Sequence, residues 1–383
     1  MSSGLIPSAH IPVFASPNSS SIPGKAEIRQ LCDLAAQGLQ PMFDPDTGLF
    51  CKRLIRQDGA LIPEGASYRY TVMTLLGLLE YERSGGKSPI AVEGTIQKLF
   101  DRSQPVDNIG DLGLLLWLCA KGAPDRMAAV YQAYNVKSAL EDYSGAHEGN
   151  TMELSWFLTG LSYATMSPAR DQGKWRYLAE RTYELVRRNQ RGHGFFGHIF
   201  SRGSLAGMFR GRIGSFADQV YPIYGFSKFS LAFQSGTAIA EATDCAAAIC
   251  KAQGSLGQWW WHYDSFTGNV VQRYPVYSVH QHAMAPMALI ALNQASQWDF
   301  TSPMLKGLHW IFGSNEMETP TCDRSLSVIW RAIQPSSRLK LRADQASAYL
   351  RLPDESGPGN LKMLYECWPY ELGWLLYAFS NYQ

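Results

Sequence analysis

Polar and apolar positions alternate along the chain in blocks of helical length. Blocks with one polar face are expected over about 25–38, 90–102, 124–135, 174–189, 237–252 and 302–313. Each is followed by a block that is apolar around nearly its whole circumference, over about 68–82, 112–120, 150–165, 218–233, 280–293 and 365–382. A helix that is apolar all round is buried, whereas a helix with a polar face lies at the surface. The pattern therefore predicts six helical pairs, each with an outer and an inner member.

The connections between these blocks differ in length according to their direction. Links from an inner to the next outer helix are short, whereas four of those from an outer to the next inner helix are long, at about 39–67, 191–217, 254–279 and 314–364. In a closed array of helical pairs, every long link would then lie at the N-terminal ends of the inner helices. One face would carry nearly all the elaborate loops, which is how a rigid scaffold presents a site. The competing architecture is an irregular helical solenoid.

This organisation resembles the six-hairpin (α/α)6 toroid superfamily, which includes glycoside hydrolases, polysaccharide lyases and sugar epimerases. A related toroid serves the terpenoid cyclases and prenyltransferases. The resemblance is one of architecture and covers most of the chain. It implies an all-α toroid of six inner and six outer helices with long loops on one face. We expect residues 26–383 to form this single domain, after a flexible tail over residues 1–25 that is rich in Ser and Pro.

Composition narrows the functional classes. The chain has 383 residues, of which 46% are hydrophobic, so it can bury a large core, and its net charge of +1 does not favour nucleic acid. The longest apolar runs are shorter than the roughly 20 residues that cross a bilayer. Seven cysteines without a CxxC pair, and an N-terminus without a basic leader, favour the cytoplasm. A Walker loop and a GxSxG elbow are absent, and no cofactor is expected.

The stretch 257–292 is the densest in groups that bind or react. Three consecutive tryptophans cannot all face one way in an extended segment, so at least one is expected in the central cavity, and we expect Trp260 to be a platform for a sugar ring. His262 and Asp264 are predicted to orient one another. His280 and His282 resemble half a metal site, but no third ligand is evident nearby. They are therefore expected to be cavity-wall residues, without a metal.

Candidate acid and base groups stand where inner helices begin. Asp218 and Glu153 are the carboxylates predicted to act on the substrate, and His262, His280, Tyr277 and Tyr221 are predicted to transfer protons or orient groups. A purely structural role stays open for each of them: helix capping for Asp218 and a favourable helix-dipole position for Glu153. The wider set expected around the mouth is Glu64, Arg69, Asp107, Asp111, His147 and Tyr370.

An anionic substrate is indicated by the link from Arg187 to Arg212, which holds six arginines, many glycines and no acid. Arginine binds carboxylate or phosphate with two parallel hydrogen bonds. The alternative is a solvated basic loop. The predicted substrate-binding residues are Trp259, Trp260, Asp264, Tyr274, His282, Glu148, Arg210, Arg212 and Glu366.

The function predicted from these residues is acid-base chemistry on an acidic glycan or glycoconjugate, by glycoside hydrolysis first and otherwise by elimination or epimerisation. A terpenoid-cyclase-like or prenyltransferase-like enzyme with an aromatic cavity is the alternative. Against it, the chain lacks both the DxDD acid motif and recognisable zinc ligands. A non-catalytic glycan-binding protein is the third possibility. The sequence leaves the oligomeric state open.

Overall fold

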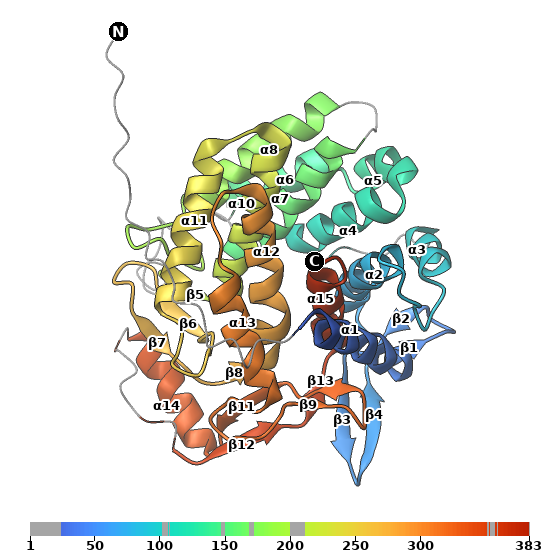
Figure 1. Cartoon of the computed structure of the whole chain (residues 1–383). Coiled ribbons are helices and arrows are strands. Elements are labelled where there is room, and N and C mark those ends of the chain that lie inside the picture. The colour runs from blue at the N-terminus through green and yellow to red at the C-terminus, as the bar shows by residue number, and fades with distance from the viewer. Residues whose placement is uncertain are drawn as a thin grey trace.

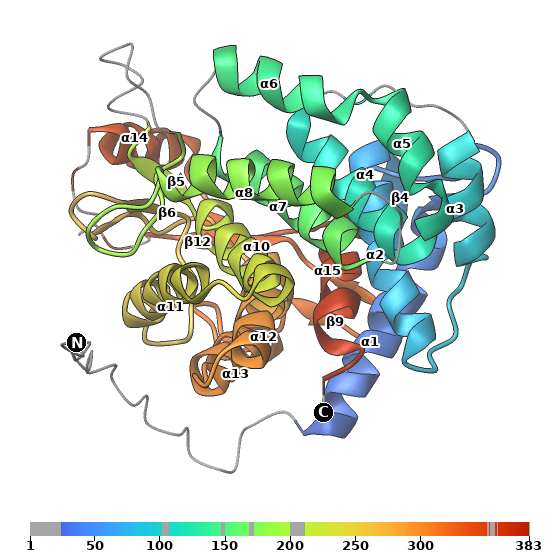
Figure 2. The same cartoon turned by 90° about the horizontal axis from the view of Figure 1, so that it is seen from above.

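The computed structural model describes residues 24–101, 106, 108–146, 150–167, 172–199, 211–350, 352, 357 and 359–382. Helices dominate this part of the chain and are arranged as a ring within a ring (Figure 1). Figure 2 looks down on the ring and shows α8, α11 and α13 outside α7, α10 and α12. The expected tail lies almost wholly outside the described residues.

The predicted outer blocks are helical. They form α1 (Lys25–Leu39), α3 (Val92–Asp101), α5 (Met127–Ala133), α8 (Gln172–Arg187), α11 (Gly236–Lys251) and α13 (Thr301–His309). Short helical turns η1 (Gln40–Met42), η2 (Pro124–Arg126) and η4 (Trp310–Phe312) adjoin three of them. Two helices were not predicted: α6 (Val136–Ala146) in the third pair and α14 (Arg338–Tyr349) in the last long link.

The predicted inner blocks form the inner ring. They are α2 (Tyr68–Arg83), α4 (Ile109–Gly122), α7 (Thr151–Met166), α10 (Ala217–Phe233), α12 (Ala285–Ala295) preceded by the π-helical turn η3 (His280–Met284), and α15 (Pro369–Phe379). Three of them begin at side-chain caps, from Ser67, Asn108 and Asn150. The last inner helix, α15, begins later than expected. Trp368 is still in extended conformation, and Pro369 follows it as the first helical residue, a position for which proline is well suited.

The inner ring closes where α15 packs against α2. A Cβ atom on Gly77 would lie 1.9 Å from the carbonyl oxygen of Gly373, and one on Gly113 would lie 2.3 Å from the backbone nitrogen of Phe157 in the next helix. The absence of side chains at these two glycines therefore lets neighbouring inner helices approach backbone to backbone. Because the last inner helix packs against the first, the chain forms a toroid and not an open solenoid.

The four long links contain all the strands of the described residues except β13, which lies in the predicted block 365–382; the all-α prediction did not include them. They are β1 (Phe43–Asp44), β2 (Leu49–Phe50), β3 (Arg53–Gln57), β4 (Ala60–Glu64), β5 (Ile213–Ser215), β6 (His262–Asp264), β7 (Val270–Gln272), β8 (Val276–Tyr277), β9 (Cys322–Asp323), β10 (Val328–Ile329), β11 (Ala332–Pro335), β12 (Leu361–Leu364) and β13 (Glu366–Cys367). They pair antiparallel as β1-β2, β10-β9, β12-β11-β8, β13-β3-β4 and β5-β6-β7. Small sheets thus tie links that are far apart in sequence into one layer above the inner helices.

Aromatic side chains fill the centre of the toroid on the other side. The hydroxyl groups of Tyr163, Tyr224 and Tyr377 lie 2.8–3.0 Å from one another. The buried indole of Trp117 stacks on the rings of Tyr163 and Tyr224 and also on Trp374. We call these three tyrosines the tyrosine cluster. These stacked rings separate the central cavity, on the loop side, from a hollow of about 160 Å³ that the three tyrosines line together with Lys121 and Lys228.

Candidate active site

The central cavity lies at the N-terminal ends of the inner helices. Its volume is about 210 Å³. It is lined by Arg69, Tyr70, Met73, Met152, Trp156, Ala217, Tyr221, Trp261, Tyr277, Val279, His280, Met284, Arg331 and Tyr370. The first turns of four inner helices, the turn η3 and two of the long links therefore contribute to one wall. No Asp or Glu of the described residues lines it.

One cationic side of the cavity is an arginine held by an acid of the next inner helix. Arg69, in the first turn of α2, donates from Nη2 to Oδ2 of Asp111 at 2.9 Å and from Nε to Oδ1. Asp111 is in the first turn of α4, and its side chain is 7% exposed. The guanidinium also lies 5.8 Å from the ring centroid of Trp156. A two-point contact of this kind fixes the direction of the guanidinium plane.

The second cationic side is more deeply buried. Arg331 precedes β11 and donates from Nη1 to Oε1 of Glu371, in the first turn of α15. Its guanidinium stacks on Trp368 at 3.7 Å and lies 5.0 Å from the ring of Tyr277. Burial opposes the charge of Arg331, but Glu371, Tyr370 and Tyr277 together outweigh it and raise the pKa of the guanidinium above its usual range. Arg331 is therefore a permanently charged group that is flanked by the aromatic rings of Trp368 and Tyr277.

Glu371 itself is a buried acid with an unused oxygen. Its side chain is 1% exposed, and Oε2 has no hydrogen-bond partner. Burial raises the pKa of Glu371 to about 7, although Arg331 opposes this shift. The carboxyl group is thus close to half protonated at neutral pH, directly behind Arg331.

An aromatic wall faces the arginines. The ring of Trp261 stacks on the imidazole of His280 at 5.8 Å and lies 4.7 Å from Tyr277. Nδ1 of His280 faces the carbonyl oxygen of Trp259 at 3.5 Å. Burial lowers the pKa of His280 to about 3, so the imidazole is neutral at neutral pH. The wall therefore offers ring faces, a phenol and a neutral imidazole to a ligand.

Several of the predicted residues come together here. Tyr221, Tyr277 and His280 line the cavity, together with Arg69 and Tyr370 of the wider mouth set. Glu366 lies just behind the wall, where it accepts hydrogen bonds from Arg53 at 2.8 Å and from Nε1 of Trp368 at 2.9 Å. A position at or just before the start of an inner helix therefore predicts several of the residues that line the cavity.

The tryptophans require a correction. Trp260 is not in the cavity wall: its indole Nε1 donates to the carbonyl oxygen of Ala252, at the end of α11. Trp259 is fully buried and stacks on Phe216. Trp261 is the member of the triplet that reaches the cavity. The prediction that at least one tryptophan faces inward is confirmed, but the choice of Trp260 as the platform is wrong, because residue periodicity in a short irregular segment does not define which side chain points inward.

The two predicted carboxylates adjoin the cavity without lining it. Asp218 follows the lining residue Ala217, and its Oδ2 accepts from the backbone nitrogen of Ser215 at 2.8 Å and lies 3.2 Å from Nδ1 of His198. Its Oδ1 is buried and has no partner. Glu153 follows the lining residue Met152 and accepts from the hydroxyl of Tyr143 at 2.8 Å.

His262 and Asp264 do not form the expected orienting pair. His262 interacts through Nδ1 with Oε1 of Gln272 at 2.7 Å, across β6 and β7. Asp264 is fully buried, and its Oδ1 accepts from the backbone nitrogen of Phe266 in the turn that follows. The two side chains therefore engage different partners, His262 on the neighbouring strand β7 and Asp264 in the turn after β6.

The remaining predicted residues lie away from the cavity wall or outside the described residues. Tyr274 donates to Glu316 at 3.1 Å. His282 is fully buried, neither ring nitrogen has a partner, and burial lowers its pKa to about 3, so it is a core residue and not a cavity-wall residue. Arg212 stacks on Phe266 at 3.7 Å. Glu148, Arg210, Asp107 and His147 lie outside the described residues.

Sequence reasoning missed Arg331, Glu371, Trp156 and Tyr70. Glu371 carries the same signal that selected Glu153, an acid in the first turn of an otherwise apolar helix. Arg331 had no such signal, because it lies within a link of fifty residues whose path was not predicted. Within the described ranges, no group of three or more His, Cys, Asp or Glu could hold a metal ion, and no helix is both long and apolar enough to span a membrane.

Comparison with known proteins identifies the fold. No protein-family model and no curated protein matches the chain. Among solved structures, it resembles a possible member of the GH105 family from Salmonella enterica serovar Paratyphi A, with a TM-score of 0.61 and 12% identity over 99% of both chains. It also resembles an unsaturated glucuronyl hydrolase specific for heparin (TM-score 0.60, 15% identity, 94% of this chain and 96% of the other).

A third likeness is to a mutant of an unsaturated glucuronyl hydrolase from Streptococcus agalactiae, solved in complex with dGlcA-GalNAc6S. Its TM-score is 0.57, with 13% identity over 97% of this chain and 96% of the other. These likenesses extend over almost the whole length of both partners. The fold of this chain is therefore that of the (α/α)6 toroid.

Proposed function

We propose that this protein is a glycoside hydrolase that binds an acidic sugar unit in the central cavity. The observation that carries the proposal is the pair of arginines, Arg69 and Arg331, which converge on one cavity while each is held in place by a carboxylate behind it. A cavity prepared in this way favours an anionic ligand. The solved toroids with the same architecture include hydrolases of unsaturated glucuronyl substrates, which carry such a group.

The ligand would be held by charge on one side and by ring stacking on the other. Asp111 occupies two donor nitrogens of Arg69, and a guanidinium has five N–H groups, so donors remain for a substrate carboxylate. The indoles of Trp156 and Trp261 provide apolar faces for the C–H surfaces of a sugar ring. Together these groups select an acidic sugar over a neutral one.

Hydrolysis requires one group to protonate the leaving oxygen and another to take a proton from water. Water oxygen bonds to the anomeric carbon as the glycosidic C–O bond breaks. Glu371, with a pKa near 7, is suited to hold and return a proton, and Tyr277, Tyr370 and His280 are polar groups of the cavity wall that could pass it on. Glu153 and Asp218 remain predicted acid-base carboxylates, each one residue from a lining position.

The test is turnover of a panel of oligosaccharides that end in an acidic sugar, beside neutral analogues of the same length. Mass spectrometry separates the reactions: hydrolysis adds one water per bond cleaved, elimination adds none, and epimerisation leaves the mass unchanged. Arg69→Gln is expected to abolish turnover, whereas Arg338→Gln, at an exposed position on α14, is a matched control. If no acidic oligosaccharide is bound or altered, the proposal is wrong.

One observation favours a second candidate. Methionines and aromatic rings make up much of the cavity, and no pair of carboxylates of the described residues lines it. This composition also suits a terpenoid-cyclase-like reaction, in which ring faces stabilise a carbocation. Including prenyl diphosphates in the same panel separates the two candidates, because cyclisation gives a product that contains no sugar.

A further inference from the structure

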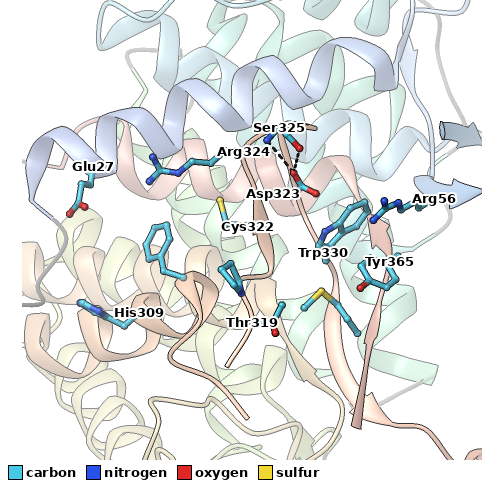
Figure 3. A pocket seen from close by; sticks show the side chains of 13 residues that line it. Glu27, Arg56, His309, Thr319, Cys322, Asp323, Arg324, Ser325, Trp330 and Tyr365 are labelled. Carbon is cyan, nitrogen blue, oxygen red and sulfur yellow. Dashed lines mark hydrogen bonds between the residues drawn. The ribbon is translucent and has the colours of Figure 1, made fainter. Parts of the chain in front are cut away.

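A second and larger hollow lies on the rim of the toroid, beside the central cavity. Its volume is about 750 Å³, compared with about 210 Å³ for the central cavity. Helix α1, strand β3, the end of α13 and the β9–β10 hairpin surround it, and Figure 3 shows its side chains. We call it the rim groove and define it by Arg56, Arg324, His309, Trp330 and Tyr365.

Two arginines enter the rim groove from different elements. Arg56 belongs to β3 and Arg324 to the turn after β9, and both are exposed. In Figure 3 they lie on different sides of the groove, Arg324 toward α1 and Arg56 beside Tyr365. Neither guanidinium donates a hydrogen bond to, or forms an ion pair with, the part of the chain that the structure describes. Their donors are therefore available to a ligand.

The acids of the rim groove are already engaged. Asp323 accepts through Oδ1 from the backbone nitrogen and the hydroxyl of Ser325, at 3.1 and 2.7 Å, and from the backbone nitrogen of Leu326. Glu27 accepts from the backbone nitrogen of Gly24 at 3.0 Å. Burial lowers the pKa of His309 below its usual range, so this imidazole is neutral at neutral pH. The arginines thus provide the charged hydrogen-bond donors of the groove that are free to bind an acidic group.

An aromatic platform lies beside Arg56. Tyr365 is 46% exposed, and its ring packs edge-on against the buried Trp330 with ring centroids 5.1 Å apart. The guanidinium of Arg56 lies 5.6 Å from the centroid of Tyr365. A supported, exposed ring next to a free cation matches what a sugar ring with an acidic substituent requires.

The rim groove and the central cavity share a wall. Trp330 faces the groove, whereas the next residue, Arg331, faces the cavity. The wall is held by the backbone hydrogen bond from Arg331 to the carbonyl oxygen of Glu366, at 2.8 Å, and Glu366 directly follows Tyr365. The two hollows are therefore separate but adjacent.

We propose that the rim groove is a second binding site for an acidic saccharide, distinct from the central cavity. The ring of one sugar unit lies on Tyr365 with its carboxylate or sulfate at Arg56, and Arg324 contacts the acidic group of a neighbouring unit. The ligand class rests on the function proposed above, but the groove does not depend on catalysis in the cavity. A long chain would contact the groove, and a short one need not.

The experiment measures calorimetric binding of acidic hexasaccharides, carboxylated or sulfated, with a neutral hexasaccharide and acidic disaccharides for comparison. The double substitution Arg56→Gln with Arg324→Gln, and Tyr365→Ala alone, are each expected to weaken binding of acidic hexasaccharides by about tenfold, or about 1.4 kcal/mol. Arg338→Gln is the matched control and is expected to bind as the unchanged chain does. Turnover of acidic disaccharides is expected to stay the same in all groove variants, with unfolding midpoints confirming that each variant is folded.

Groove variants that bind acidic hexasaccharides within twofold of the Arg338→Gln control would overturn the proposal, as would an unchanged chain that binds no acidic hexasaccharide. A comparison of the two acidic hexasaccharides shows whether carboxylate or sulfate is preferred. If nothing is turned over but the groove variants still lose binding, the proposed hydrolase function fails while the rim groove stands.

Discussion

The two ends of the inner ring are built from the same six helices, but their polar groups differ in kind and in how they are paired. At the loop end, the first turns carry acids, among them Asp111, Glu153, Asp218 and Glu371, whereas Lys121 lies in the last turn of α4 near the tyrosine cluster. The helix dipole favours negative charge at N-termini and positive charge at C-termini. At the loop end, the acids hold arginines around a cavity, while in the tyrosine cluster the hydroxyls satisfy one another.

The two ends also differ in how much hydrogen-bonding capacity their polar groups have left for a ligand. In the tyrosine cluster each hydroxyl has two partners, so little hydrogen-bonding capacity is left over. At the loop end, Oε2 of Glu371, behind the cavity wall, has no partner, and the arginines of the wall keep spare donors. Buried polar groups with unused capacity are costly, and native proteins retain them mainly where function needs them.

The most severe change at the loop end is Arg331→Met. It removes the partner of a buried carboxylate, so the free energy of unfolding is expected to fall by about 3–5 kcal/mol. Urea denaturation measures this loss. Arg331→Met combined with Glu371→Leu is expected to recover part of it, because both charges are then gone. A single variant as stable as the unchanged chain would show that the pair is not buried as described.

The raised pKa of Glu371 gives the loop end a characteristic pH dependence. Its folded pKa, about 7, lies above the ordinary value of 4.5, so between these pH values the folded state binds more protons than the unfolded state. Glu371 therefore makes stability fall as pH rises from about 4.5 to about 7, by at most about 1.4 kcal/mol per pH unit. Denaturation across this window is expected to show a flatter profile for Glu371→Gln. Identical slopes in both proteins would contradict the assignment.

In the tyrosine cluster, Tyr224→Phe removes one hydroxyl and leaves two partly buried partners short of a hydrogen bond. The expected loss of stability is about 1 kcal/mol, with turnover in the cavity unchanged. Tyr277→Phe is the matched variant at the loop end, where a similar loss of one hydroxyl is expected to reduce turnover. Equal effects on turnover would mean that the two ends are not functionally distinct.

The smallest expected effect concerns the tryptophan triplet. Trp260→Phe removes one hydrogen bond to Ala252 outside the cavity and is expected to cost under about 1 kcal/mol, without a change in ligand affinity. Trp261→Phe keeps a ring but shrinks a cavity wall, so weaker binding of an acidic disaccharide is expected. Calorimetry on both variants tests which indole belongs to the site.

The helices were accessible from sequence because their pattern is local. The pattern within the block 150–165, which is apolar all round, indicates a buried helix, and that within the amphipathic block 174–189 indicates a surface helix. Both blocks are helices in the structure. The start of α15 was placed too early because the residues before Pro369 are as apolar as the helix itself. Whether these residues continue a helix or pair with β3, as β13 does, depends on a strand more than 300 positions away.

The residues of the site were harder to predict from the sequence, because most of them come together through contacts between distant parts of the chain. Tyr221, Tyr277 and His280 were found from their positions at the starts of inner helices or just before them. Arg331 and Glu371 are 40 residues apart, and only the path of the intervening link brings them together. The separation of His262 from Asp264, and of Trp260 from Trp261, follows from strand and loop geometry that composition does not specify.

The sequence by itself determined the alternation of buried and exposed helices and the end of the ring at which the long links gather, because helical periodicity and link length are local properties. Only the tertiary structure decided which arginine meets which acid, which indole faces the cavity, and that a second hollow with free guanidinium groups lies beside the first. These depend on how four long links pack over the helix ends, and packing is a property of the whole chain.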